Sequence, residues 1–162
     1  MIYNISGTGN FDIQHDGSSA FYVKDGGNVG VGTTTPATNA RVAIKDGHLQ
    51  SQQTTAPTYT ADAGAGTSPT ISLSKATDIA GIINVTTGTA PSAWSVIATV
   101  NYNKTYSSAP IVVFSPINNK AASVSSTVML FNFTTTGFSI YASTALTAAT
   151  SYQWSYMVIE TQ

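Results

Sequence analysis

The sequence predicts an all-β fold, and three observations carry this prediction. Strong helix formers other than alanine are scarce, because the 162 residues include one Glu and four Leu. Thr, Val, Ile, Tyr and Phe are abundant, and their branched or aromatic side chains suit a pleated strand better than a helical turn. Thirteen Gly and six Pro interrupt the chain at short intervals, and no window shows sustained apolar spacing of three and four residues.

Six apolar runs between turn signals predict the strands of the C-terminal half. They cover residues 79–85, 96–100, 111–114, 128–133, 138–141 and 154–159. Short strands at near-regular spacing are typical of an antiparallel sandwich or barrel. We therefore expect residues 71–162 to form a β-sandwich head.

The preceding residues have a different composition. The segment 51–69 contains a single large apolar side chain, Tyr59. Such a segment buries too little surface to offset about 1–2 kcal/mol of backbone entropy per residue. We expect residues 51–70 to be a linker, or to be ordered by neighbouring chains, and residues 1–50 to form an N-terminal attachment and stalk segment of β-structure.

Two of the predicted strands are apolar on both faces. In the strand 128–133, Met129, Phe131 and Phe133 alternate with Val128 and Leu130, and the strand 154–159 shows a similar pattern. A sheet with one face in water alternates between apolar and polar residues. We therefore expect the second face of these strands to be covered, and another subunit is the favoured cover.

Composition excludes several classes of protein. The chain has six Lys and Arg against seven Asp and Glu, and the absence of a long basic tract argues against nucleic-acid binding. No apolar stretch approaches the roughly 18 residues of a membrane span, so membrane insertion is not expected. Because the chain has no Cys, it has neither a disulfide framework nor a cysteine metal site.

No motif for catalysis or cofactor binding is complete. In the Gly-rich segment 25–36, the third glycine of a dinucleotide fingerprint is replaced by Thr35, and no phosphate-loop Gly-Lys-Ser/Thr follows. The acidic residues are scattered, several of them in Asp-Gly turns, rather than set as the carboxylate pair of a glycosidase. His15 and His48 lack metal-ligand spacing. We therefore expect no enzyme, with no catalytic residues, no metal and no cofactor.

Two predicted loops carry residue types that bind sugars. Tyr102, Asn103 and Tyr106 lie between two predicted strands, and Asn118 and Asn119 follow the next one. An exposed tyrosine ring can stack on a sugar, and Asn can hydrogen-bond its hydroxyls. These five residues are the candidate receptor-binding residues. The alternative, that Tyr102 and Tyr106 flank a hairpin and pack on its edge, stays open.

The segments Phe21–Lys24, Val29–Pro36 and Ala40–Ile44 resemble a recurring segment of bacteriophage fibre and tailspike proteins. In that family a strand, a Val-Gly-Ile-Gly-Thr-x-x-Pro turn and a Lys-Leu-x-Val strand form part of an intertwined homotrimer. Val31 stands where Ile is usual, and Arg41-Val42-Ala43-Ile44 stands for the final strand. The resemblance covers about a quarter of the chain. It implies a trimeric stalk built on five residues whose glycines permit close backbone approach between copies: Val29, Gly30, Val31, Gly32 and Pro36.

The C-terminal half is similar to the head domains at the tips of such fibres. The segments that carry this similarity are 106–113, 134–140 and 152–156, which occur in the same order. This order also resembles that of H-type lectin modules, which are trimeric sugar-binding β-sandwiches. No loop residue matches a lectin motif closely enough to transfer a binding role.

These resemblances imply a virion protein. It would be a homotrimeric tail or head fibre, attached to other virion proteins through its N-terminal segment, with a head that binds a host cell-surface glycan or protein. Three weak sites on one rigid tip would gain avidity. Three other functions stay open: a purely structural capsid or baseplate protein without a host ligand, a polysaccharide-degrading tailspike, and a bacterial lectin.

Overall fold

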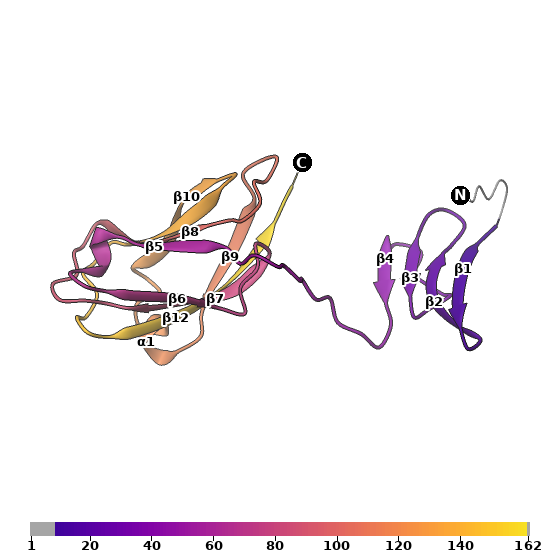
Figure 1. Ribbon diagram of the computed structural model, residues 1–162, viewed down its shortest axis with the longest axis horizontal. Helices are drawn as coiled ribbons and strands as arrows, with labels where there is room; N and C mark the ends of the chain where they lie inside the picture. Colours follow the sequence, from indigo (N-terminus) through magenta and orange to yellow (C-terminus); the bar gives the residue numbers. More distant parts are fainter. Residues whose placement is uncertain (1–8, 162) are drawn as a thin grey trace. The chain divides into compact units, whose positions relative to one another are not determined.

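The structure, a computed structural model, describes residues 9–161 (Figure 1). Strands dominate it, which confirms the predicted all-β class. The chain divides into two compact units, unit 1 (residues 1–50) and the head (residues 51–162). The first eight residues of the predicted attachment segment lie outside the described residues.

Unit 1 is a single four-stranded sheet. Its strands are β1 (Phe11–His15), β2 (Ser18–Val23), β3 (Val29–Val31) and β4 (Val42–Ile44), in that order across the sheet. The first two pairs are antiparallel, and β3 runs parallel to β4. Asp16 and Gly17 make the turn between β1 and β2 with positive φ angles, a conformation that Gly and Asp tolerate better than most residues.

One face of this sheet is apolar across all four strands, and we call it the unit 1 apolar face. Cross-strand partners point to the same side of a sheet, and the register places eight apolar residues in two parallel rows. Over residues 9–50 no second sheet or helix is present to cover them. The outer row consists of Ile13, Phe21, Val31 and Ile44, and each of these side chains is between 39% and 50% exposed. The other row consists of Phe11, Val23, Val29 and Val42.

The predicted stalk glycines are required by contacts within the chain. A side chain at Gly30 would overlap the backbone carbonyl of Thr33, in the turn that follows β3. Gly32 has a φ of +71°, which favours glycine. Pro36 is buried. Within one copy, the need for glycine at position 30 is therefore explained by its close approach to the carbonyl of Thr33. The role of these residues in a trimer stays a prediction.

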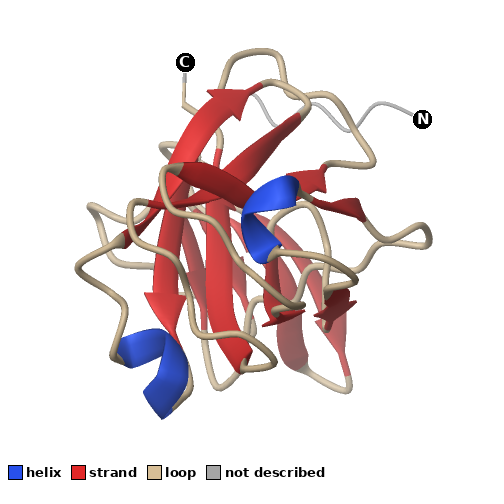
Figure 2. Cartoon of the chain, turned by 90° about the vertical axis from the view of Figure 1, so that its left-hand side faces the viewer, coloured by secondary structure: helices blue, strands red, loops and turns tan. Residues whose placement is uncertain are grey.

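The head contains two four-stranded sheets (Figures 1 and 2). All six strands predicted from the apolar runs are confirmed. One sheet has the order β10-β11-β8-β5 and the other β6-β7-β12-β9. The bounds are β5 (Thr58–Ala61), β6 (Thr70–Ser74), β7 (Ala80–Thr86), β8 (Ser95–Asn101), β9 (Ile111–Pro116), β10 (Val128–Thr134), β11 (Gly137–Ala142) and β12 (Ser151–Ile159).

Aromatic side chains fill the centre of the head. Trp154 has no exposed surface, and its ring stacks on Tyr152 and Phe114 with centroids 5.7 and 5.5 Å away. Phe138 reaches the same core from the other sheet. Two short helices, η1 (Ala63–Ala65) and α1 (Asn119–Ala122), complete the head.

The prediction that residues 51–70 form a linker is wrong, because this segment contains a strand and a short helix of the head. Residues 58–61 form β5, which pairs along β8, and Gly64 of η1 packs so closely on β8 that a side chain there would overlap the Val96 carbonyl. The argument from large apolar side chains failed because this segment is stabilised by backbone hydrogen bonds and by small buried residues such as Ala65.

No described helix is both long and apolar enough to cross a membrane.

Candidate functional site

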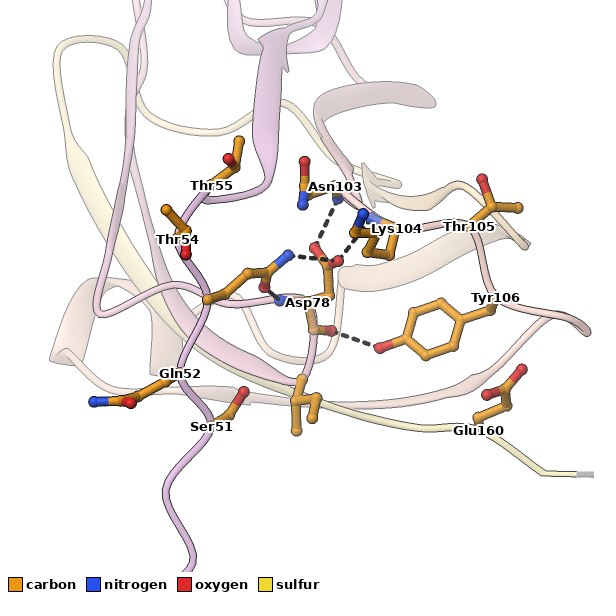
Figure 3. Close-up of a pocket in the computed structure, with 12 residues that line it drawn as sticks. Ser51, Gln52, Thr54, Thr55, Asp78, Asn103, Lys104, Thr105, Tyr106 and Glu160 are labelled. Carbon is orange, nitrogen blue, oxygen red and sulfur yellow. Dashed lines mark hydrogen bonds between the residues drawn. The ribbon is translucent and has the colours of Figure 1, made fainter.

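A polar cavity of about 670 Å³ opens at one end of the head (Figure 3). Three stretches of chain line it, residues 51–55, 78–79 and 103–106, together with Glu160. These stretches lie at the chain's entry into the head, before β7, after β8 and after β12. The cavity is therefore built from segments that are up to 109 positions apart in the sequence, from Ser51 to Glu160.

Asp78 holds the walls of the cavity together. Its side chain is buried and accepts three hydrogen bonds, from the backbone N–H of Asn103 (2.7 Å), the backbone N–H of Lys104 (2.8 Å) and the side-chain amide of Gln53 (2.7 Å). The N–H of Asp78 donates back to Gln53 Oε1 at 2.6 Å. A buried carboxylate is tolerated when its oxygens are satisfied in this way. Asp78 is thus a positioning residue.

Three tyrosines pack behind this wall. Tyr106 donates its hydroxyl to the carbonyl of Asp78 (3.0 Å), and Tyr156 donates to the carbonyl of Thr77 (2.8 Å). The ring of Tyr102 lies edge-on to Tyr106, with centroids 4.9 Å apart. Within the described residues, the buried hydroxyl of Tyr102 has no hydrogen-bond partner. The rings of Tyr102 and Tyr156 therefore pack behind the loop 103–106, to which Tyr106 itself belongs.

Glu160 fixes the opposite rim. Its Oε1 accepts from the backbone N–H of Ser107 (2.7 Å) and from the Ser107 hydroxyl (2.6 Å). These hydrogen bonds stabilise the charged carboxylate and lower the pKa of Glu160 below its ordinary value. The end of β12 is thereby tied to the loop that precedes β9.

Several polar side chains at the cavity are available to a ligand. Gln52, Thr54, Thr55, Asn103 and Lys104 line it, and their side chains make no hydrogen bond within residues 9–161. Amide, hydroxyl and ammonium groups together offer donors and acceptors in mixed order. This mixture suits a neutral, hydroxyl-rich molecule better than a strongly charged one.

The structure divides the predicted receptor-binding residues. Asn103 and Tyr106 line the cavity. Tyr102 is only 9% exposed and belongs to the hydrophobic core, where it contacts Phe138. A ring packed in this way cannot stack on a sugar, so the prediction that Tyr102 binds the receptor is wrong. The alternative, in which Tyr102 and Tyr106 flank a hairpin and pack on its edge, is wrong about the hairpin, because β8 and β9 belong to different sheets. Tyr102 packs into the core instead.

Asn118 and Asn119 lie at the other end of the head. Asn118 caps α1 by accepting from the N–H of Ala121 (2.8 Å), and it donates to the carbonyl of Ser151 (3.2 Å). Ser151 begins β12, whereas Glu160 directly follows its last residue. A nine-residue strand spans about 26 Å. The five predicted residues therefore do not form one site, and Asn118 has a structural partner on each side.

Sequence reasoning missed Asp78, Gln53 and Trp94. The first two are joined across 25 positions, a separation over which no local motif operates. Trp94 is 76% exposed at the start of β8, at the end opposite to Asn103. It was visible in the sequence as a lone tryptophan among small residues, but a single exposed apolar side chain is common on a protein surface and does not by itself indicate a site.

The tyrosine cluster predicts instability at alkaline pH. Burial raises the pKa of Tyr102, Tyr106 and Tyr156 above its ordinary value near 10, and the charge of Asp78 raises it further. The unfolded chain loses these protons at lower pH than the folded chain, so stability is present below pH 10 and is lost as the pH rises beyond it. We expect the free energy of unfolding, measured in urea between about pH 8 and 11, to fall steeply at the top of that range.

Tyr102→Phe is the matched variant, because the hydroxyl it removes has no partner within residues 9–161. It should leave stability at neutral pH nearly unchanged and reduce the loss at alkaline pH. An unchanged alkaline slope in this variant would contradict the assignment.

Comparisons of the chain with protein-family models, curated proteins and solved structures found no match. Over the described residues, no cluster of three or more His, Cys, Asp or Glu side chains could hold a metal ion.

Proposed function

We propose that this protein is a homotrimeric fibre protein of a virion, with a stalk formed by unit 1 and a head that binds carbohydrate on a host cell surface. The unit 1 apolar face carries the proposal. The four residues of its outer row are 39–50% exposed, and residues 9–50 form a single-layer sheet with no second sheet or helix over this row. Covering that face with the same face of other copies would remove it from water.

The head supports the binding role in this proposal. It has its own aromatic core, so its loops are carried on a rigid sandwich. The cavity is fixed by Asp78 from behind, while the amide of Asn103 and the hydroxyls of Thr54 and Thr55 line it and make no internal hydrogen bond. The exposed side chain of Ile79 adds an apolar patch to this wall. A sugar presents hydroxyls and an apolar C–H face, and this wall offers partners for both.

Trimeric assembly would make weak sugar binding effective. Three copies of one shallow site on a single particle bind a surface with an avidity that can exceed the single-site affinity by roughly 10²–10⁴. The remaining parts of the proposal, attachment of unit 1 to other virion proteins and location in a tail or head fibre, rest on the sequence resemblance.

One observation favours a second candidate function. The buried polar groups at the cavity, Asp78 and Gln53, are paired with each other and with the backbone of residues 103–104. A cavity wall whose buried carboxylate is fully paired within the chain also suits a purely structural capsid or baseplate protein that binds no host ligand.

Glycan binding by the full chain tests the proposal. The assembled protein is applied to an array of bacterial surface oligosaccharides, next to the variants Asn103→Ala, Asn119→Ala and Trp94→Ala. We expect retention of one glycan class, at least a tenfold loss in Asn103→Ala, and no change in Asn119→Ala. Loss in Trp94→Ala alone would move the site to the opposite end of the head. A folded trimer that retains no glycan would favour the structural role.

A further inference from the structure

The head carries two apolar patches on its outer surface. The β9–β12 patch consists of Ile111 and Val113 on β9, which lie directly opposite Ile159 and Met157 on β12. Each of these four side chains is between 50% and 56% exposed. They alternate with partly buried residues of β9 and buried residues of β12 that pack on the core, so they point away from it.

The β10 patch lies on the other sheet. Met129, Phe131 and Phe133 are each between 46% and 52% exposed, while Val128 on the same strand is buried. The ring of Phe131 contacts that of Tyr141 on the neighbouring strand, with centroids 5.5 Å apart. The sequence-based expectation that these strands are apolar on both faces is therefore met, and no part of residues 51–161 covers the second face.

Both patches flank the same side of the sandwich. β9 is the edge strand of one sheet and β10 is the edge strand of the other, and these two edges contact each other. The opposite side, where β5 contacts β6, closes the sandwich at the other edge. The two patches thus lie on the outer faces of the two sheets, on either side of the β9–β10 edge.

The size and charge of the two patches indicate what covers them. A half-exposed apolar side chain of this size presents about 100 Å², so the β9–β12 patch presents about 400 Å² and the β10 patch about 300 Å². Both lie in the range of roughly 300–600 Å² of the largest patch on a typical monomer, which is often functional. Residues 111–116, 128–134 and 151–159 contain no charged residue. A partner that fits must be equally apolar and uncharged, and the chain itself offers two such faces.

We propose that the β9–β12 patch of one copy docks on the β10 patch of the next copy. Contact between two different faces is heterologous and closes into a ring when the rotation allows it. The two patches lie on different faces of the head, as a heterologous contact requires. Each contact would bury about 700 Å² of these side chains, counted over both copies. This is a little under half of the roughly 1,600 Å² that both partners bury in a standard interface. The number of copies, three, rests on the proposed function.

Cysteine cross-linking tests this contact without background, because the chain contains no Cys. Val113→Cys and Phe131→Cys are made as single variants of the full chain, one on each patch, and are co-expressed so that mixed assemblies form. A short bismaleimide is then added. We expect covalent dimers in the co-expressed pair, each joining one chain of each kind, and only single chains when either variant is expressed alone.

Tyr59→Cys co-expressed with Val113→Cys is the matched control. Tyr59 is an exposed aromatic residue on β5, the opposite edge strand of the β10 sheet, so no cross-link is expected. Cross-links in this control equal to those of the test pair would overturn the contact, as would dimers from either single variant alone, which indicate an isologous pairing. If the test pair gives no cross-link while the protein sediments as three chains, the inference fails and the proposed trimer stands. Sedimentation as one chain would refute both.

Discussion

Asp78→Ala should lower the free energy of unfolding of the head by about 3 kcal/mol. The substitution removes the acceptor for the N–H groups of Asn103 and Lys104 and for the amide of Gln53. Each buried donor left without a partner costs about 1–3 kcal/mol, and relaxation of the exposed ends of these segments recovers part of the sum. Urea denaturation followed by tryptophan fluorescence measures the change, since Trp154 lies in the core.

Asp62→Ala is the matched control for this variant. Asp62 lies in the same head, but its carboxylate accepts one side-chain hydrogen bond, from Thr99, and we expect a loss of about 1 kcal/mol. The functional consequence separates the two variants further. Asp78→Ala frees the loop 103–106 and should abolish retention on the glycan array, whereas Asp62→Ala should not. Equal stabilities of Asp78→Ala and the native chain would show that the cavity wall does not depend on this carboxylate.

Val31→Glu should weaken the assembly of the full chain, so that its trimer dissociates at a higher protein concentration than the native trimer does. Val31 lies in the outer row of the unit 1 apolar face, between Phe21 and Ile44. If copies cover this face, the new carboxylate is buried among apolar side chains without a partner, at a cost of several kcal/mol for each copy. Sedimentation equilibrium of the full chain measures the result.

Thr34→Glu adds the same charge three residues away, at an exposed position in the turn that follows β3. It should sediment as the native protein does. A Val31→Glu variant whose trimer dissociates at the same concentration as the native trimer would show that the unit 1 apolar face is not an assembly surface, and the proposed fibre would lose the observation that carries it.

Sequence patterns predicted the strands well where side chains decide the structure. All six strands expected between residues 79 and 159 are present, because each combines a buried row with bounded length. The prediction failed at β5 and β6, whose sequences Thr58–Ala61 and Thr70–Ser74 are short and rich in hydroxyl residues. The pairing of β5 with β8 is a backbone interaction, which leaves little trace in the hydrophobic pattern. In β6 the alternation of Ile71 and Leu73 with hydroxyl residues was visible, but it spans only five residues.

The candidate site was predicted in part. Asn103 and Tyr106 were found because polar and aromatic residues cluster in one loop, and the structure places them at the cavity. The same reasoning included Tyr102, which is buried in the core, and Asn118, which caps α1. A residue's type and loop position indicate what its side chain could do, but not on which side of the loop it lies.

By itself the sequence determined the all-β class, the six principal head strands and the two-sided apolar character of β10 and β12, because alternation and turn residues act over a few neighbouring positions. Only the tertiary structure decided that Asp78 joins Gln53 to residues 103–104, that Tyr102 is buried, and that the β9–β12 and β10 patches flank one edge. These relations connect residues far apart in the chain, and their energies depend on distance and burial in space, which a linear pattern does not contain.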